Sequence, residues 1–304
     1  MKETVLNEIK SFLREDQILI SEPMSRHTTF RCGGPAALFL QPFDRVQLVK
    51  LVMLIKSCGE PFFVLGNGSN LLVSDKGYDG CIISTAHLDD ITLEHDTQIR
   101  AECGALNSAV ASFAKDHSLT GFEFAAGIPG TIGGAMIMNA GAYGGEMKDI
   151  VISVTAIAPS GEEVTISGSD CDFAYRTSRL KREDFIVTGA LLELTKGNPE
   201  DILARMTELA LKRKEKQPLE YPSAGSTFKR PEGYFAGKLI EDAGLRGFTV
   251  GGAQVSEKHC GFVVNKGDAT ATDVFNLICE VKKRVLDASG VELEPEVIML
   301  GDFS

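Results

Sequence analysis

Apolar side chains recur along the N-terminal half of the chain with the spacings of helices and of strands. Intervals of three and four residues predict helices over residues 3–20 and 44–58. In the second of these helices the interval selects one apolar stripe, made of Val46, Val49, Val52 and Met53. Short apolar runs bounded by Gly, Pro, Asn or Ser predict strands at residues 61–65, 150–158, 164–166 and 185–194, the middle two forming a hairpin.

A change in composition near residue 199 predicts a domain boundary. Asn198 as N-cap, Pro199 at the first helical position and two acidic residues in the first turn predict the start of a helix. The helix is expected to end near Lys212–Lys216, because positive charges suit a helix C-terminus. We therefore expect one domain over residues 1–199 and a second over residues 200–304.

The second domain is expected to be a small α+β unit. The pattern predicts a helix over residues 235–242 and strands at residues 260–264 and 297–300. The segment 270–273 resembles a capping box, and it precedes an apolar stripe of helical spacing formed by Val274, Leu277, Ile278, Val281 and Val285. Helices packed on strands in this order are typical of the α+β class.

Composition narrows the classes of protein that fit. The chain has 304 residues with 43% hydrophobic and 24% charged content, which indicates a globular protein with two or more lobes. A net charge of -11 disfavours a nucleic-acid partner, yet leaves room for a local basic cluster that binds a phosphorylated ligand. The N-terminus lacks a signal-peptide pattern and no apolar run reaches ~20 residues, so we expect a cytoplasmic protein without a membrane span. Seven scattered cysteines without a C-x-x-C pair predict reduced thiols and no cysteine metal site.

A first Gly-rich segment, Gly66-Asn67-Gly68-Ser69-Asn70-Leu71, directly follows the strand predicted at residues 61–65. Its glycines allow backbone amides to converge on an anion, and its polar side chains add neutral hydrogen-bonding groups. This combination suits a pyrophosphate, although a plain Gly-Asn turn between two strands explains it equally well. The Rossmann fingerprint fails because Leu71 replaces the third glycine, and the segment 233–239 lacks the spacing of a phosphate-binding P-loop.

A second Gly-rich segment extends from Gly121 to Gly145 and has eight glycines and a single charged residue, Glu123. Its small, neutral side chains would let a large flat ligand lie against the backbone. Long loops of this kind in compact domains are usually functional or disordered, and this one is too apolar for disorder. The alternative is a Gly-rich segment that packs a helix.

Three further segments carry candidate reactive side chains: Tyr175-Arg176-Thr177-Ser178, Ser223–Pro231 and Leu293–Val297. Each has an ordinary explanation by itself, such as a surface arginine, a serine in a turn or a solvated glutamate. Together with the two Gly-rich segments, and in this order, they resemble the UDP-N-acetylenolpyruvoylglucosamine reductase (MurB) family over nearly the whole chain.

The resemblance implies an α+β fold in which a two-lobed FAD domain of the vanillyl-alcohol-oxidase type, its lobes meeting near residue 80, occupies residues 1–199. The substrate domain would occupy residues 200–304, its C-terminal strand returning to the active site. FAD would be bound non-covalently, with NADPH as co-substrate. The implied cofactor-binding residues are Gly66, Asn67, Gly68, Ser69, Asn70, Leu71, Gly127, Ile128, Pro129, Gly130, Thr131, Gly133, Gly134, Asn139, Ala140 and Gly141, and residues 26–29 would assist them.

By the same resemblance Arg176, Ser226 and Glu296 occupy the catalytic positions. NADPH would provide a hydride that reaches C3 of the enolpyruvyl group of UDP-N-acetylglucosamine enolpyruvate, so that negative charge develops on C2 and the carboxylate. Arg176 would hold the carboxylate, Ser226 would donate the proton to C2, and a protonated Glu296 would help the developing enolate. Candidates for binding the rest of the substrate are Tyr221, Lys229, Arg230, Lys238 and His259.

The family has two forms, and one of them has an additional loop with a tyrosine that closes over the substrate. The span from Arg176 to Ser226 is too short for that loop, so we expect the compact form. We also expect the protein to be a monomer. Another FAD oxidase or dehydrogenase, acting on an alcohol or lactone, remains open from the residues alone. So does a flavin- or UDP-sugar-binding regulator without turnover, although the joint presence of the three catalytic residues argues against it.

Overall fold

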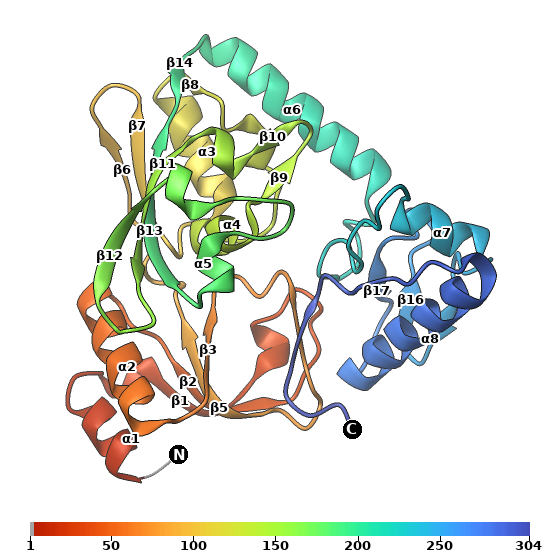
Figure 1. Cartoon of the computed structure of the whole chain (residues 1–304), viewed down its shortest axis with the longest axis horizontal. Coiled ribbons are helices and arrows are strands. Elements are labelled where there is room, and N and C mark those ends of the chain that lie inside the picture. The colour runs from red at the N-terminus through yellow and green to blue at the C-terminus, as the bar shows by residue number, and fades with distance from the viewer. Residues whose placement is uncertain (1–2) are drawn as a thin grey trace. The chain divides into compact units, whose positions relative to one another are not determined.

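The computed structural model describes residues 3–304, which form two compact units that interleave along the chain (Figure 1). The first unit comprises the residues up to Leu19, Phe39–Asn67 and Gly80–Lys212. The second comprises Ile20–Leu38, Gly68–Asp79 and Arg213–Ser304. The division expected at residue 199 stays a prediction, because compactness alone does not delimit cofactor and substrate domains.

The main sheet of the first unit has five strands in the order β12-β11-β13-β7-β6, and every neighbouring pair is antiparallel. The strands are β6 (Ile91–Glu94), β7 (Gln98–Glu102), β11 (Val151–Ile157), β12 (Glu163–Ser167) and β13 (Ile186–Glu193). The hairpin predicted at residues 150–166 and the strand predicted at residues 185–194 are confirmed as β11–β12 and β13. Helix α4 (Ile132–Met138) packs against β13 and β7 (Figure 1).

Short elements connect this sheet to the rest of the unit. Two small antiparallel pairs are formed by β8 (Leu119–Thr120) with β14 (Thr195–Lys196) and by β9 (Gly141–Ala142) with β10 (Gly145–Glu146). The helical elements are α3 (Asn107–Asp116), α5 (Arg179–Arg182), η3 (Glu123–Ala125), η4 (Met147–Asp149) and η5 (Ser169–Cys171). The second Gly-rich segment is therefore not a single loop, because α4 occupies its centre.

A four-stranded sheet has the order β1-β2-β5-β3, with β3 and β5 parallel. Its strands are β1 (Ile18–Pro23), β2 (Pro35–Leu40), β3 (Phe62–Leu65) and β5 (Tyr78–Ser84), and the short helix η2 (Met24–Arg26) follows β1. The helix predicted over residues 3–20 was wrong in its length. Helix α1 (Glu3–Lys10) is much shorter, η1 (Glu15–Gln17) follows it, and the apolar, β-branched run that begins at Ile18 forms a strand instead.

Helix α2 (Arg45–Cys58) confirms the helix predicted over residues 44–58, with Asp44 as N-cap and Gly59 as a left-handed C-cap. The apolar stripe that the spacing selected is only partly buried. Val46 is 76% exposed and Met53 is 52% exposed, whereas the buried side chains are those of Leu48, Leu51, Val52 and Ile55. Apolar residues lie on more than one side of this helix, so its spacing alone did not determine which side packs.

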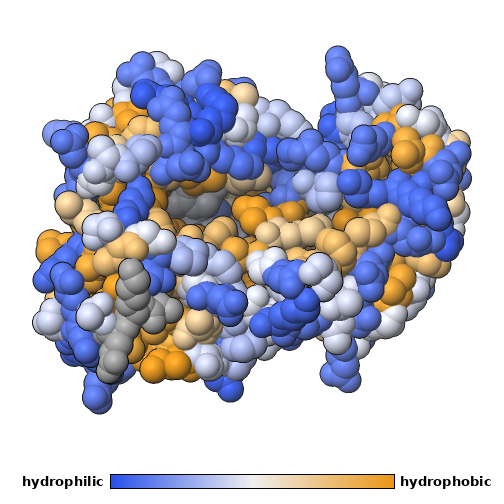
Figure 2. Space-filling model, turned by 60° about the horizontal axis from the view of Figure 1, so that its bottom comes forward, coloured by the Kyte–Doolittle hydropathy of each residue, from blue (hydrophilic) through white to orange (hydrophobic). Residues whose placement is uncertain are grey.

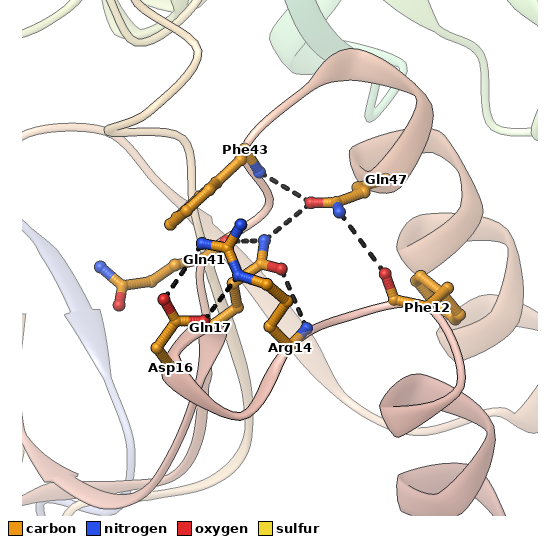
Figure 3. Close-up of polar contacts among 7 residues, drawn as sticks. All are labelled: Phe12, Arg14, Asp16, Gln17, Gln41, Phe43 and Gln47. Atoms are coloured by element: carbon orange, nitrogen blue, oxygen red, sulfur yellow. Dashed lines mark hydrogen bonds and ion pairs between the residues drawn. The ribbon is translucent and has the colours of Figure 1, made fainter.

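A buried polar network joins the N-terminal segment to the start of α2 (Figure 3). Gln17 is fully buried, and its Nε2 donates to the carbonyl of Gln41 at 2.8 Å and to Oε1 of Gln47 at 2.7 Å. Its Oε1 accepts from the backbone N–H of Arg14 at 3.0 Å. Because buried amide groups are costly when unpaired, this complete set of hydrogen bonds specifies how the segment packs.

The second unit has its own hydrophobic core, around helix α8 (Ala271–Ser289). The helix packs on an antiparallel sheet of β15 (Thr249–Val250), β16 (Ala253–Val255) and β17 (Val263–Asn265) (Figure 1). The five predicted stripe residues are all fully buried, and the Thr270–Asp273 capping box is present, so this prediction is confirmed in full. The strand predicted at residues 260–264 begins later, at Val263.

Two further predictions for the C-terminal region are confirmed. Helix α7 (Ala236–Asp242) corresponds to the helix predicted over residues 235–242. Strand β18 (Ile298–Leu300) corresponds to the last predicted strand, and it pairs in parallel with β4 (Leu71–Val73), directly after the first Gly-rich segment. Helix α6 (Pro199–Lys216) begins as predicted, where the side chain of Asn198 accepts from the N–H of Glu200 at 2.8 Å.

Candidate active site

The two Gly-rich segments meet in the first unit at Gly66 and Thr131. A Cβ atom on Gly66 would lie 2.6 Å from Oγ1 of Thr131, so only glycine allows this approach. Thr131 is buried and is the N-cap residue of α4. Nearby Gly127, Pro129 and Gly134 are exposed, so a ligand can reach the backbone here. The two segments predicted to bind the cofactor are therefore in contact within one unit.

Gly68 belongs to the second unit and lies against the polar segment 26–29. Its φ is +60°, and a Cβ atom would lie 2.0 Å from the carbonyl oxygen of His27. The backbone N–H of Thr29 donates to the carbonyl of Gly68 at 3.2 Å. The conformation of the Gly66–Leu71 turn is thus determined by a close backbone contact that excludes any side chain at position 68.

The packing alternative for the second Gly-rich segment applies to Gly133. Its N–H donates to the carbonyl of Cys103 at 2.8 Å, and a Cβ atom would lie 3.0 Å from that oxygen. Gly133 therefore lets α4 approach the chain at Cys103. At Gly134 the nearest atom to such a Cβ, Oγ1 of Thr131, is 3.9 Å away, so this glycine is not required by packing. The packing interpretation therefore applies to Gly133, and the cofactor-binding interpretation stays a prediction for the other glycines.

Asn107 is a candidate site residue that the sequence did not indicate. It lies at the start of α3, where its N–H donates to the carbonyl of Gly130 at 3.1 Å and its Nδ2 to that of Ile128 at 3.4 Å. It is 1% exposed, and its Oδ1 has no hydrogen-bond partner among residues 3–304. A buried acceptor without a partner is rare unless a ligand or water satisfies it. Together with the Gly66–Thr131 contact, this fits a neutral, hydrogen-bonding surface for FAD.

Arg176 lies in the first unit, in a tight turn from Ala174 to Thr177. The two end residues exchange backbone hydrogen bonds of 3.0 and 3.3 Å. Arg176 has a φ of +55°, in the left-handed region that costs a non-glycine residue roughly 1–2 kcal/mol. Its guanidinium carbon lies 5.5 Å from the centre of the Tyr175 ring. Strained backbone of this kind clusters at functional sites, which is consistent with a catalytic side chain.

The second unit brings the segments of Ser226 and Glu296 together. The N–H of Glu296 donates to the carbonyl of Thr227 at 2.8 Å, and the N–H of Lys229 donates to that of Glu294 at 2.9 Å. Thr227 is fully buried and anchors the pair, because its Oγ1 accepts from the N–H of Val263 at 2.9 Å. Ser226 and Glu296 are both half-buried, so their side chains remain accessible.

Asn70 connects the first Gly-rich segment to this pair. Its Nδ2 donates to the carbonyl of Glu296 at 3.0 Å, and its own carbonyl accepts from the N–H of Ile298 at 3.0 Å. The pairing then continues into the parallel strands β4 and β18. A residue predicted from the sequence only as a cofactor contact therefore also holds the backbone of a predicted catalytic residue.

The basic residues proposed to bind the substrate already have partners in the protein. Lys229 forms an ion pair with Glu294, Lys238 with Asp242 at 2.5 Å, and the guanidinium of Arg230 lies 4.0 Å from the ring centre of Phe235. Lys238 and Arg230 are exposed, so these contacts are weak enough to exchange for a ligand.

Tyr221 and His259 make well-defined local contacts. The hydroxyl of Tyr221 accepts from Nζ of Lys266 at 2.8 Å. Burial lowers the pKa of His259, whose Nδ1 accepts from the N–H of Gly261 at 3.0 Å. The carbonyl of Gly261 in turn accepts from the N–H of Thr227 at 2.8 Å, so His259 helps to hold the residue next to Ser226.

Residues 3–304 contain no group of three or more His, Cys, Asp or Glu side chains placed to hold a metal ion. Among the same residues, every helix is too short or too polar to span a bilayer.

The fold and one family model define the class of protein. Residues 36–167 match the model of the FAD binding domain. The glucose dehydrogenase Phl p 4.0202 shares the fold over 65% of this chain and 45% of its own, with a TM-score of 0.52 and 14% identity. The chain thus contains an FAD-binding domain and has the α+β fold that the sequence predicted.

Residues 217–300 match the model of the UDP-N-acetylenolpyruvoylglucosamine reductase C-terminal domain. Enzymes of that name from Caldanaerobacter subterraneus and Agathobacter rectalis are 50% and 51% identical, and each alignment covers at least 99% of this chain and 100% of the relative. The crystal structure of the reductase from Thermus caldophilus has a TM-score of 0.78 and 34% identity, covering 93% of this chain and 98% of its own. The chain belongs to the UDP-N-acetylenolpyruvoylglucosamine reductase family, which confirms the predicted resemblance.

Proposed function

We propose that this protein reduces the enolpyruvyl group of UDP-N-acetylglucosamine enolpyruvate to give UDP-N-acetylmuramate, a peptidoglycan precursor. Membership of the reductase family supports this substrate. The structural observation that carries the proposal is the hydrogen-bonded pairing of the Ser226 segment with the Glu296 segment. It holds a hydroxyl and a carboxyl on neighbouring stretches of backbone, as proton transfer to a reduced enolpyruvyl group requires.

When bound, FAD would supply the redox chemistry, which is hydride transfer from NADPH to the substrate. The residues proposed to bind it are those of Gly66–Leu71 and residues 127–134, with Ala140, Gly141 and Asn107. Their side chains carry no charge, so the cofactor would be held by backbone amides and neutral hydrogen bonds. Non-covalent binding follows, because no nucleophilic side chain is needed in this arrangement.

Arg176 is proposed to bind the carboxylate of the enolpyruvyl group. Its guanidinium offers a planar pair of N–H donors that matches the two carboxylate oxygens. Hydride addition at C3 increases negative charge on C2 and on this carboxylate. A fixed positive charge therefore stabilises the transition state more than the ground state, which is the condition for catalysis.

Ser226 is proposed to donate a proton from its hydroxyl to C2 of the substrate. Because serine is a weak acid, the transfer needs the enolate as a strong base and a neighbouring group to restore the proton. Glu296, in its protonated form, is proposed to stabilise the enolate. Tyr221, Lys229, Arg230, Lys238 and His259 are proposed to bind or to border the nucleotide sugar.

The remaining proposals concern the form of the enzyme. Between Arg176 and Ser226 the chain forms only α5, β13, β14, α6 and the segment 217–225, which supports the compact family form. The substrate domain is proposed to cover residues 200–304 and the FAD domain residues 1–199. The protein is proposed to be a cytoplasmic monomer that binds neither membrane nor nucleic acid. Its net charge of -11 supports the last of these points.

The test is stopped-flow absorbance of Ser226→Ala, with Ser223→Ala as a matched control from the same segment. Flavin bleaching by NADPH should stay within about twofold of wild type in both variants. Reoxidation of the reduced flavin by the enolpyruvyl substrate should slow by about 10²–10³-fold in Ser226→Ala only, the usual loss for one transition-state donor. Loss of both half-reactions in Ser226→Ala, or of neither, would contradict the assignment.

A further inference from the structure

Asn139 was predicted to bind the cofactor, but its side-chain amide is used within the first unit. It follows α4, has a φ of +44° and is 3% exposed. Its Nδ2 donates to Oε2 of Glu146 at 2.8 Å and to the carbonyl of Ala174 at 3.3 Å. Its Oδ1 accepts from the N–H of Lys148 at 3.0 Å. Both N–H donors are thus engaged with protein atoms.

The bond to Ala174 connects Asn139 to the turn that carries Arg176, since Ala174 is the first residue of that turn. A second bond holds the other end of the turn. The hydroxyl of Ser178, which is fully buried, donates to the carbonyl of Ile137 at 2.9 Å. Both ends of the turn are therefore attached to the C-terminal end of α4. A strained left-handed residue persists where surrounding contacts over-determine its backbone in this way.

Glu146 completes the connection. Its carboxylate accepts from Asn139 and forms an ion pair with Lys148 at 3.0 Å. The hydrogen bond from Lys148 lowers the pKa of Glu146 most; burial opposes this, and Asn139 and the positive charge of Arg176 lower it further. Glu146 is therefore ionised at neutral pH, and its charge interacts with that of Arg176. The sequence did not indicate this residue, which follows the second Gly-rich segment directly.

We propose that Asn139, supported by Glu146, is a positioning residue for Arg176. It holds the turn from Ala174 to Thr177 in the conformation from which the guanidinium meets the substrate's carboxylate. The inference rests on the proposed function, in which Arg176 binds that carboxylate. It assigns the second Gly-rich segment two tasks: backbone around Thr131 faces the cofactor, and Asn139 organises the catalytic arginine.

The test compares two ligands that differ in the carboxylate. UDP-N-acetylmuramate carries it and UDP-N-acetylglucosamine does not, so the ratio of their dissociation constants reports the contact with Arg176. Calorimetric titrations of the oxidised FAD-loaded enzyme provide both constants. Asn139→Gly removes the amide and tolerates the left-handed backbone, and Asn139→Asp keeps the size and the acceptor but loses both donors. Arg176→Ala is the reference variant.

We expect the preference for UDP-N-acetylmuramate to fall at least about tenfold in both Asn139 variants, as in Arg176→Ala. The affinities for UDP-N-acetylglucosamine and FAD should stay within about twofold. In Asn139→Gly/Arg176→Ala the preference should fall no further than in Arg176→Ala, because the two residues act through one contact. A uniform loss of affinity for both ligands, which a merely structural role would produce, would overturn the inference.

Other outcomes separate the inference from the function on which it rests. If Arg176→Ala leaves the preference unchanged, the assignment of Arg176 to the carboxylate is wrong, and the inference is wrong with it. If Arg176→Ala abolishes the preference and neither Asn139 variant changes it, only the positioning role is refuted. If FAD affinity falls in both Asn139 variants while the preference is kept, Asn139 is a cofactor residue, as the sequence first suggested.

Discussion

Replacing Gly68 by alanine tests how the first Gly-rich segment is held. The substituted residue would keep a φ of +60°, which costs an L-residue roughly 1–2 kcal/mol. Its Cβ would also lie 2.0 Å from the carbonyl oxygen of His27, whereas Cβ atoms in real structures essentially never make contacts shorter than 3.0 Å. Relieving the contact requires a shift of about 1 Å in one of two packed segments, and such overpacking typically costs about 1–3 kcal/mol.

The shift would also weaken the hydrogen bond from Thr29 to the carbonyl of Gly68, now 3.2 Å long, at about 0.5–1.5 kcal/mol. Together these effects predict a loss of about 3–6 kcal/mol for Gly68→Ala. Gly290→Ala is the matched control within the same unit. Its φ is +72° and no atom lies within 4 Å of the added methyl group, so it should lose only about 1–2 kcal/mol.

Urea unfolding of the FAD-free protein, followed by circular dichroism, measures the two stability losses. Titration with FAD, followed by quenching of flavin fluorescence, measures whether the turn still binds the cofactor. We expect the dissociation constant for FAD to rise at least about tenfold in Gly68→Ala, or 1.4 kcal/mol, and to stay unchanged in Gly290→Ala. Equal stability losses in the two variants would refute the steric argument, and unchanged FAD affinity in Gly68→Ala would refute the role of this turn in binding.

Two further predictions concern stability. Because burial lowers the pKa of His259 in the folded state, the unfolded chain takes up this proton first. Stability should therefore fall as the pH decreases below the unfolded value of about 6.5, and His259→Gln should reduce the change in urea midpoint between pH 7.5 and 5. Gln17→Leu should lower stability by about 2–5 kcal/mol, because the carbonyl of Gln41 loses its donor, the N–H of Arg14 loses its acceptor, and Oε1 of Gln47 keeps only the N–H of Phe43.

Each of these predictions has a control. His117→Gln is the control for His259→Gln, and it replaces a histidine whose Nδ1 contacts the carbonyl of Phe113. The change in urea midpoint between pH 7.5 and 5 should differ less from wild type in this variant than in His259→Gln. An unaltered pH dependence in His259→Gln would mean that other groups cause it. Gln98→Leu removes an exposed hydrogen bond to Glu193 and should cost under about 1 kcal/mol. A similar small loss in Gln17→Leu would show that the network in Figure 3 does not contribute as its burial implies.

Local sequence signals correctly predicted those elements in which the capping residues and the apolar spacing indicate the same structure. Helix α8 has a capping box and a single apolar stripe, so its start and its apolar stripe were correct from the sequence. Helix α2 has apolar residues on several sides, and the stripe that the spacing selected is only partly buried. The helix predicted over residues 3–20 failed for a similar reason, since its spacing did not reveal that the run from Ile18 pairs in a sheet.

The sequence by itself determined the family, the FAD-binding class and the segments that bear candidate chemistry, because ordered motifs and glycines are local properties of the chain. The tertiary structure decided which of those residues touch. It placed Gly66 against Thr131 and Asn70 against Glu296, and it revealed the buried acceptor of Asn107 and the hydrogen bond from Asn139 to the Arg176 turn. These contacts join residues far apart in sequence. Hydrogen-bond geometry and desolvation depend on the positions of atoms, which no local pattern of residues contains.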